Sequence, residues 1–306
     1  MRASGSRRAR TADTGGTADL SNRSALVTGA TSGIGFSTAR RLAARGATVL
    51  VTGRDSRRGI EAAGELRRAA GHERVEFIRV DHSTVAANLA LAEGLQGRLG
   101  RLDMLVNNVG GLIRSRVTTG DGYELTLALN FLAPFVLTGS LLPLMLASDS
   151  ARCVNVISSA FTMAKGDPLD DIQSEQAYSP LRVLARAKLL ALVWTAALAD
   201  QHRGSRLSEV AVNPGMAWTP GTQSLTPAAV PAWRYIWPIV RFFQRRADPD
   251  RAAAACEAVV DAPATAIDGR YFDGQKPHPL PRSAVEAGLR ERVLKLGKNL
   301  ADHAAR

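Results

Sequence analysis

Cysteine is scarce in this sequence. Only Cys153 and Cys256 occur among 306 residues, and each lies inside an apolar run. Two isolated cysteines exclude a disulfide framework and a metal site built on paired cysteines. We therefore expect no metal, two buried thiols and a reducing, cytoplasmic environment.

Lysine is scarce as well, with 5 lysines against 34 arginines, although the net charge is +11. Such a charge would suit a nucleic-acid partner if it gathered on one face or one helix. The arginines are instead scattered, and four of them (Arg2, Arg7, Arg8 and Arg10) lie in the opening segment. We expect no nucleic-acid partner.

Long uninterrupted apolar runs are missing. The longest apolar stretch, 129–147, contains Asn130, Pro134 and Pro143, which favours a buried helix over a membrane span. Residues 1–22 are polar, basic and without an apolar stretch, so they predict a disordered tail and no secretory signal. Association with a membrane is not expected.

From Ser24 onward, short apolar segments alternate with stretches of helical character. The segments are SALVT, ATVLVTG, RVEFIRV, LDMLVNN, RCVNVIS, LSEVAVN and GRYFD. Alternation of this kind predicts an α/β fold, namely a Rossmann-type doubly wound parallel sheet of about seven strands with helices on both faces. No linker follows the tail, so we predict a single domain over residues 23–306.

Two segments interrupt the alternation. Residues 160–180 are polar and acidic, whereas residues 220–247 are rich in aromatic side chains. In a doubly wound sheet both would follow strands at the carboxyl edge, where ligands bind. We predict two substrate lids; contact of 220–247 with a membrane interface is the alternative.

A glycine-rich turn, TGATSGIG at 28–35, follows the first predicted strand and opens a helix. Such a turn lets the backbone approach a pyrophosphate, and the helix start offers unpaired N–H groups to the anion. The predicted cofactor-binding residues here are Gly29, Ser32, Gly33, Ile34 and Gly35. A turn that serves packing alone is the alternative.

The second predicted strand ends at Thr52-Gly53-Arg54. A dinucleotide-binding fold places there an acid for the ribose 2′-hydroxyl or an arginine for a 2′-phosphate. Arg54 predicts NADP(H) over NAD(H), with the adjacent Asp55 as a competing acid. Asp81, just after the third predicted strand, is placed to meet the adenine or to cap a helix.

Several motifs in order resemble the short-chain dehydrogenase/reductase family across residues 23–275. TGATSGIG matches its glycine motif, NNVG at 107–110 its Asn-Asn-Ala-Gly motif, and NPGMAWT at 213–219 its Pro-Gly-x-x-x-Thr loop. The segment DDIQSEQAYSP and the late GRYFDG at 269–274 are similar to the retinol-dehydrogenase/WWOX-like branch.

The resemblance implies roles for individual residues. It makes Asn130, Ser159 and Lys188 the catalytic residues, with Ser158 as the alternative serine. It adds further residues to the cofactor site, namely Asn108, Gly110, Lys188, Pro214, Gly215 and Thr219.

The family's catalytic helix carries Tyr-x-x-x-Lys, and here Leu184 stands in the tyrosine position. In the family reaction the tyrosine exchanges the proton while the lysine lowers its pKa and binds the ribose. Leu184 has no donor or acceptor. Water, Ser159, a carboxylate of the first lid (Asp167, Asp170 or Asp171) or a substrate phenol are the alternative proton sources. Tyr178 could replace the tyrosine only if its loop folded back.

Three hypotheses follow for the function. The leading one is an NADP(H)-dependent oxidoreductase of atypical mechanism, acting on a carbonyl or alcohol of a bulky apolar small molecule, such as a polycyclic natural product in a tailoring step. The second is a non-redox enzyme on the same fold, a cyclase, dehydratase or isomerase. The third is an inactive interaction protein, with a homodimer face on the helices around 129–147 and 181–202.

Overall fold

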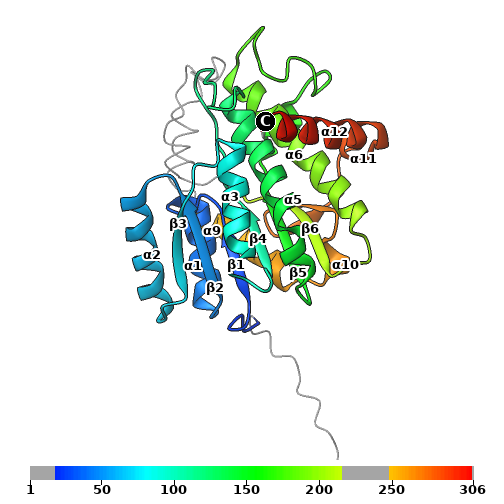
Figure 1. Cartoon of the computed structure of the whole chain (residues 1–306). Coiled ribbons are helices and arrows are strands. Elements are labelled where there is room, and N and C mark those ends of the chain that lie inside the picture. The colour runs from blue at the N-terminus through cyan, green and yellow to red at the C-terminus, as the bar shows by residue number, and fades with distance from the viewer. Residues whose placement is uncertain (1–17, 216–247, 305–306) are drawn as a thin grey trace, which may run out of the picture.

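The computed structural model describes residues 18–215 and 248–304, and an eight-stranded sheet runs through them (Figure 1). The strand order is β3-β2-β1-β4-β5-β6-β7-β8, and every neighbouring pair is parallel except β7 and β8. The strands are β1 (Ser24–Val27), β2 (Thr48–Gly53), β3 (Val75–Arg79), β4 (Met104–Asn107), β5 (Ala151–Val156), β6 (Leu207–Asn213), β7 (Arg270–Asp273) and β8 (Lys276–His278).

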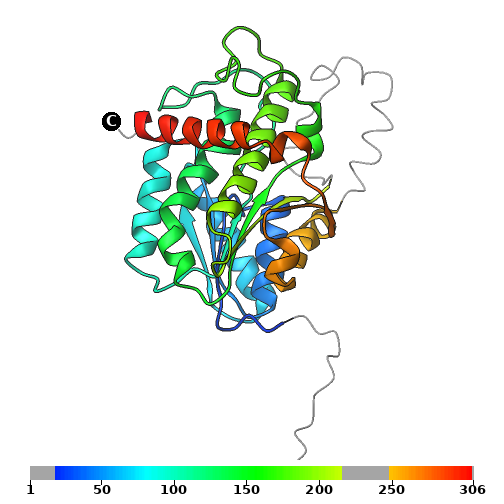
Figure 2. The ribbon, with the colours of Figure 1, turned by 90° about the vertical axis from the view of Figure 1, so that its right-hand side faces the viewer.

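Helices cover both faces of the sheet (Figure 2). On one face α1 packs between α2 and α9, and on the other α3 packs against α5, with α6 beside β6. The long helices are α1 (Gly33–Ala44), α2 (Ser56–Ala70), α3 (Val85–Gln96), α5 (Ala133–Leu146), α6 (Pro180–Gln201), α9 (Pro249–Asp261) and α12 (Ala287–Ala304). The short ones are α4 (Leu125–Leu127), η1 (Ala128–Leu132), η2 (Ser159–Met163), α10 (Ala264–Ile267) and α11 (Arg282–Val285).

The first strand shows why its neighbours are apolar along their whole length. Ala25 and Val27 pack into the cluster under α1 and α9, whereas Leu26 packs into the cluster under α3 and α5. All three are fully buried, because a parallel sheet between two helix layers has no solvated face. The seven predicted strands are all present. The eighth, β8, was not predicted, since its Lys-Pro-His sequence is exposed and has no apolar signal.

The predicted disordered tail is too long at its inner end. Residues 1–17 lie outside the described residues. Leu20, by contrast, is buried, and its N–H donates to the Arg45 carbonyl after α1. A single leucine among polar residues carries no periodicity, so its packing could not be inferred from the sequence.

Helix α12 lies across the ends of α3, α5 and α6 (Figure 2). It is held there by the Tyr123 hydroxyl, which donates to the Leu300 carbonyl at 2.7 Å. Together with α11 it covers α6, in which residues 187–199 are buried without interruption. The C-terminal helices thus cover part of α6, one of the two helices suggested for a homodimer, while Leu146 on the other, α5, is exposed.

Among the described residues, one segment, Leu125–Leu146, is long and apolar enough to cross a membrane. Its most apolar window is 67% buried inside the fold. Such burial is that of a core helix, as the interrupting Asn130 and prolines predict.

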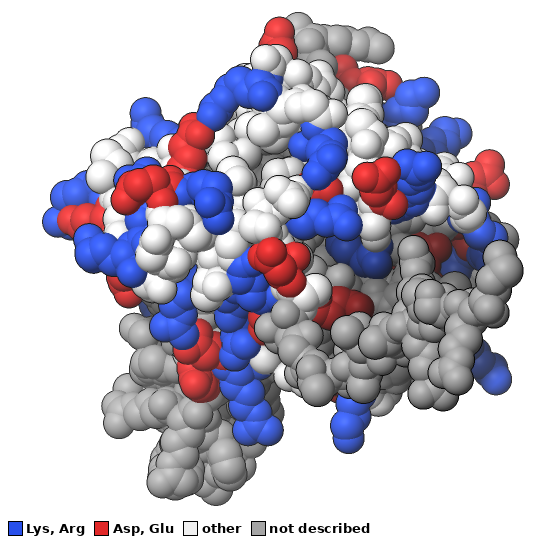
Figure 3. Space-filling view, turned by 90° about the horizontal axis from the view of Figure 1, so that it is seen from below, with Lys and Arg blue, Asp and Glu red and all other residues white. Residues whose placement is uncertain are grey.

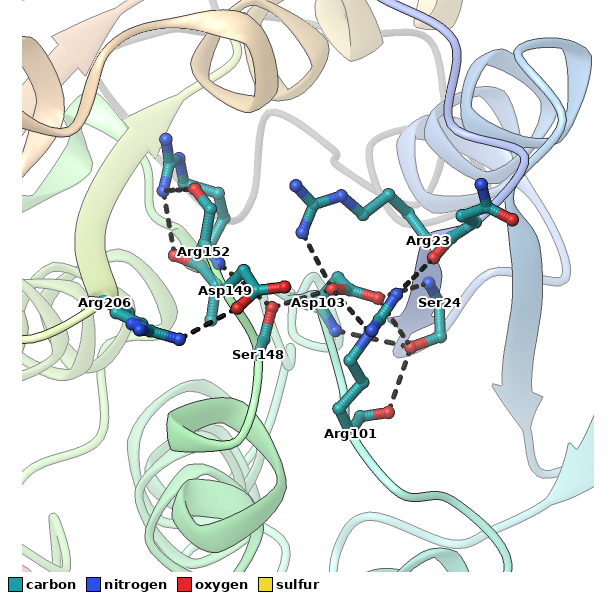
Figure 4. Close-up of polar contacts among 11 residues, drawn as sticks. Arg23, Ser24, Arg101, Asp103, Ser148, Asp149, Arg152 and Arg206 are labelled. Carbon is teal, nitrogen blue, oxygen red and sulfur yellow. Dashed lines mark hydrogen bonds and ion pairs between the residues drawn. The ribbon is translucent and has the colours of Figure 1, made fainter.

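The amino edge of the sheet is closed by ion pairs around Asp103, which is 1% exposed (Figure 4). Its carboxylate accepts hydrogen bonds from Ser24 N at 2.8 Å, Ser148 Oγ at 2.7 Å and Arg23 at 2.9 Å. Burial opposes its ionisation, but these donors and the charge of Arg101 outweigh burial and lower the pKa. On the face seen from below, Lys and Arg alternate with Asp and Glu among the described residues (Figure 3). The polar groups at the amino edge are thus paired with one another, and we expect a ligand site at the opposite, carboxyl edge.

The docking of α12 can be tested at its two glycines. A Cβ at Gly297 would lie 2.5 Å from the Phe135 ring, whereas a Cβ at Gly288 meets nothing within 4 Å. We expect Gly297→Ala to lower the free energy of unfolding by about 1–3 kcal/mol through overpacking. Gly288→Ala, the control, should leave it unchanged or raise it by up to about 1 kcal/mol. Urea unfolding of both variants measures the difference; equal stabilities would contradict this packing.

Candidate functional site

Most of the predicted site residues lie at the carboxyl edge of the sheet, because they follow the ends of parallel strands, whereas Asn130 and Lys188 reach it from η1 and α6. The glycine turn follows β1, Arg54 follows β2, and Asp81 follows β3. Asn108 and Gly110 follow β4, and the two serines follow β5. Pro214 and Gly215 follow β6, while Thr219 and the predicted lid at 220–247 lie outside the described residues.

The glycine turn has the backbone that its sequence predicts. Gly29 and Gly33 have φ angles of 63° and 60°, which favour glycine. At position 35 glycine is needed for a different reason: the backbone packs so closely on Asn108 that a Cβ would lie 2.4 Å from its side chain. The turn therefore packs directly on the loop after β4.

The start of α1 has no side-chain cap. Ser32 is the N-cap residue, in extended backbone, but its hydroxyl makes no capping bond, and the first turn holds no acidic residue. Asp55, Thr84 and Asp248 cap α2, α3 and α9 in the ordinary way. Free N–H groups and the partial positive charge of α1 thus suit an anion at the carboxyl edge. Ile34 lies beside them, half-buried.

Asn108 serves the turn rather than facing away from it. Its side-chain nitrogen donates to the carbonyls of Thr28 at 2.9 Å and Gly29 at 3.2 Å. The Thr28 hydroxyl in return accepts the N–H groups of Asn108 and Val109 at 3.0 Å each. Asn108, which follows the neighbouring strand β4, thus holds the glycine turn in shape.

The end of β2 leaves Arg54 as its available polar residue. Asp55 is engaged in capping, since its carboxylate accepts Arg58 N at 3.1 Å, and this bond lowers its pKa. Arg54 is exposed. Asp81 accepts Ser83 N at 3.0 Å. Burial disfavours the Asp81 carboxylate, yet the bonds from Ser83 and the charge of Arg54 outweigh burial and lower its pKa.

Gly110, Asn130 and Lys188 come together although they are far apart in the sequence. A Cβ at Gly110 would lie 2.4 Å from Asn130 Oδ1 and 3.4 Å from Lys188 Nζ. Asn130 is 2% exposed and lies in the π-helical turn η1, a distortion that recurs at functional sites. Its amide donates to Thr126 O at 2.8 Å and exchanges hydrogen bonds with the backbone of Gly111 at 3.1 Å.

Lys188 is a buried cation at this point. It is 6% exposed, and its ammonium donates to the carbonyl of Val156, the last residue of β5, at 2.8 Å. Burial lowers its pKa to about 8. The ammonium has three donors, so two remain for a hydroxyl or an anion at the edge.

The serines after β5 differ in their engagement. Ser158 Oγ accepts Ala160 N at 3.3 Å and caps η2, whereas Ser159 is exposed. Leu184, one helical turn before Lys188 and on the same face of α6, is half-buried and belongs to none of the core clusters of the described residues.

Tyr178 folds back toward the site but is bound to the backbone. Its hydroxyl donates to Ile113 O at 2.9 Å and lies 3.4 Å from the Thr126 hydroxyl. Burial raises its pKa. Tyr178 therefore anchors the loop before α6 to the loop after β4.

Residues 23–229 match the family model described as short chain dehydrogenase. The chain belongs to the short-chain dehydrogenase/reductase family. Members of this family are oxidoreductases that use NAD(P)(H).

The comparisons with individual proteins agree with the family. The chain is 33% identical to human retinol dehydrogenase 12 over 84% of its own length and 79% of that protein. An uncharacterised protein of Mycobacterium paratuberculosis superposes with a TM-score of 0.72 at 28% identity, covering 94% of this chain and 96% of that one. Pseudomonas aeruginosa RhlG, solved as an NADP active-site complex, superposes with a TM-score of 0.64 at 27% identity, covering 89% of this chain and 98% of that one.

Other polar residues support the family's site and were not predicted. Asn107 bonds Thr138 at 2.9 Å and Asn155 at 2.8 Å beneath the loop after β4. His82, Thr52 and Asn88 form a second buried chain. The sequence carries one signal for such residues, a polar side chain inside an apolar strand, as at Thr52 and Asn107. No group of three or more side chains suited to a metal lies among the described residues.

The contact between Gly110 and Asn130 can be isolated with a matched pair of variants. Gly110 and Gly111 have φ angles of 152° and 148°, so alanine is strained at both, but only Gly110 would clash with Asn130. We expect Gly110→Ala to cost about 1–3 kcal/mol more stability than Gly111→Ala, on the scale of overpacking. Thermal unfolding of both proteins measures this. Equal losses would mean that Asn130 moves aside freely.

Proposed function

We propose that this chain is an NADP(H)-dependent oxidoreductase that acts on a carbonyl or alcohol of a bulky apolar molecule without a tyrosine acid. The observation that carries the proposal is the cluster of Gly110, Asn130 and Lys188 at the carboxyl edge, beside the uncapped start of α1. A buried lysine with unused donors and a helix start without a cap suit the ribose and the pyrophosphate of one nucleotide.

The preference for NADP(H) rests on Arg54. One oxygen of the Asp55 carboxylate accepts the Arg58 N–H at the start of α2, so this acid has a structural role, while the neighbouring Arg54 is exposed and accessible to a 2′-phosphate. Arginine recognises phosphate with two parallel hydrogen bonds. The NADP complex of RhlG, a relative of 27% identity, supports the same choice.

The nicotinamide would exchange a hydride with the substrate carbon. This chain's own residues would orient the reacting oxygen and supply positive charge. The exposed Ser159 hydroxyl is suited to donate a hydrogen bond to that oxygen, since Ser158 is engaged in capping. Lys188 would hold the ribose, and its buried charge would favour negative charge that develops nearby.

In this proposal the proton comes from water. Hydrogen bonds from Leu169 N and Arg292 lower the pKa of Asp167. For Asp171, three backbone N–H donors at 175–177 outweigh desolvation and lower its pKa too. Such carboxylates are poor acids at neutral pH. Losing a general acid costs about 10²–10⁴ in rate, so turnover would be slow rather than absent.

A cavity of about 560 Å³ between η2, α6, α11 and α12 gives room for a bulky molecule, and its wall is partly apolar and partly charged. Its wall includes Phe161 and Thr162, which follow Ser159 in η2, and Leu189, next to Lys188. Leu289 from α12 and Pro281 also line it, as do the charged Asp167, Glu286 and Arg292. Neither Ser159 nor Lys188 is in its wall, so the cavity lies next to the reacting groups rather than around them. The likeness to retinol dehydrogenase 12, named for an apolar alcohol, points to an apolar substrate.

The role of Arg54 can be tested by calorimetric titration with NADPH and NADH. We expect NADPH to bind more tightly, and Arg54→Ala to weaken NADPH roughly 10-fold or more while leaving NADH unchanged, the loss of a charged hydrogen bond. Arg68→Ala, the same charge change at the exposed far end of α2, is the control. If Arg54→Ala and Arg68→Ala weakened NADPH binding equally, the overall charge of the protein, and not a contact of Arg54 with the 2′-phosphate, would explain the loss. No binding of either nucleotide would refute the redox proposal.

The consequence of Leu184 can be tested by restoring a phenol. We expect Leu184→Tyr to raise kcat, by about 10-fold or more, because a general acid then stands one turn before Lys188. Retinal with NADPH is the probe, and a product two hydrogens heavier is the readout by mass spectrometry. Leu184→Phe, with the ring but no hydroxyl, should show no gain. An equal gain in both variants would assign the effect to packing.

The same measurement separates the non-redox alternative. Leu184 is half-buried outside the core clusters, so it could line an apolar pocket in a cyclase, dehydratase or isomerase. A product of unchanged mass, or one lighter by a water, would favour that function over hydride transfer.

A further inference from the structure

A buried histidine lies beneath the glycine turn at 28–35, called the nucleotide turn below because it forms part of the proposed nucleotide site. His82 follows Asp81 at the carboxyl end of β3 and is 3% exposed. Its Nε2 lies 2.7 Å from Thr52 Oγ1, and its Nδ1 lies 2.6 Å from Asn88 Oδ1. Thr52 and Asn88 are also fully or almost fully buried, so these contacts are sheltered from water.

The hydrogen bonds of Asn88 define the direction of this chain. Its Nδ2 donates to the carbonyls of Thr84 at 2.6 Å and His82 at 3.2 Å, so its Oδ1 faces the ring as an acceptor. His82 Nδ1 must then carry the hydrogen, and in the neutral ring Nε2 is an acceptor. The Thr52 hydroxyl therefore donates to Nε2.

Thr52 in turn holds the first residues of the glycine turn. Its Oγ1 accepts Gly29 N at 3.3 Å, and its carbonyl accepts Ala30 N at 3.0 Å. Gly29 is the residue whose φ of 63° starts the turn. A chain of hydrogen bonds thus runs from α3 through His82 and Thr52 to the nucleotide turn.

We propose that His82 is a positioning residue for the nucleotide turn: its bare Nε2 orients the Thr52 hydroxyl to accept Gly29 N–H, and protonation of the ring disrupts this and weakens nucleotide binding in acid. The inference rests on the proposed nucleotide site.

Protonation would conflict with the geometry. In the imidazolium both ring nitrogens donate. The Thr52 oxygen has two lone pairs and can accept both Nε2–H and Gly29 N–H, but its own hydrogen, which points at Nε2 of the neutral ring, would lose its acceptor. A buried donor left without a partner is unfavourable, so the loop or the strand must shift.

The surroundings favour the neutral ring. Burial lowers the pKa of His82, whereas the Asn88 hydrogen bond and the charge of Asp81 act in the opposite direction. Strand β2 contributes the neutral Thr52, and Arg54 at its end acts on Asp81. On the side of α3, Asp121 accepts Val85 N. The folded-state pKa lies below the ordinary 6.5, so nucleotide affinity should be complete at pH 6.5 and above, and fall only as the pH drops through the lowered pKa of the ring.

The test compares wild type with His82→Gln, which does not titrate, by calorimetry with NADP⁺ and NAD⁺ from pH 7.5 to 5. For each nucleotide and at each pH, the affinity of wild type is divided by that of His82→Gln. This ratio does not depend on the titration of the nucleotide's own phosphate. We expect wild type to lose roughly 10-fold relative to His82→Gln at the acid end, the loss of about one buried hydrogen bond. His72→Gln, at a histidine that bonds the Ala43 carbonyl, should follow wild type. Parallel profiles of wild type and His82→Gln would overturn the proposal.

Nitrogen NMR of the free protein tests the chain without any ligand. We expect His82 to carry its hydrogen on Nδ1, and the Gly29 amide signal to shift as His82 titrates in wild type but not in Thr52→Val. A hydrogen on Nε2, or a Gly29 signal that ignores the titration, would refute the inference. If no nucleotide binds at pH 7.5, the proposed function fails, and these signals alone decide the role of His82.

Discussion

Burial of the sheet on both faces is the constraint on which the rest of this structure depends. With helices on each side, strand residues such as Leu26 and Val27 reach no water, so polar groups are displaced to the strand ends. At the amino edge they pair around Asp103. At the carboxyl edge they remain available: the ends of parallel strands place the glycines and Arg54 there, and η1 and α6 add Asn130 and Lys188. The chemistry is located by the packing.

Close approach of backbones connects the parts of that edge. Gly35 lets the turn after β1 touch Asn108, and Gly110 lets the loop after β4 touch Asn130. Thr52 ties the same turn to β2 and, through His82, to α3. Glycine removes side chains where two loops must meet, and buried polar chains then define their spacing. The turn, the loop and the π-helical segment around Asn130 therefore form one supported unit rather than separate motifs.

The sequence predicted what depends on apolar runs and motif spacing. Seven strands, the glycine turn and the meeting of Asn130 with Lys188 follow from those signals. The packing of Leu20 and the His82 chain do not, because each depends on contacts between residues far apart, 30 positions for Thr52 and His82. The short β8 was missed for another reason, since its exposed Lys-Pro-His sequence carries no apolar signal. The choice between Arg54 and Asp55 was also open in the sequence. The structure adds that Asp55 caps α2 through Arg58 N, a matter of side-chain direction that the sequence does not carry.

Lys188 bears on whether an edge without its tyrosine still binds a ligand. Its ammonium is buried with a single neutral acceptor, the Val156 carbonyl, and a buried charge without a counter-ion is destabilising. Its pKa falls to about 8 from 10.5, so the unfolded chain binds the proton more tightly, and stability increases as the pH rises through this range. The fold alone would be more stable with an apolar residue here. A buried cation with two donors left over, beside Gly110 and Asn130 at the carboxyl edge, is a group whose burial a bound nucleotide would compensate.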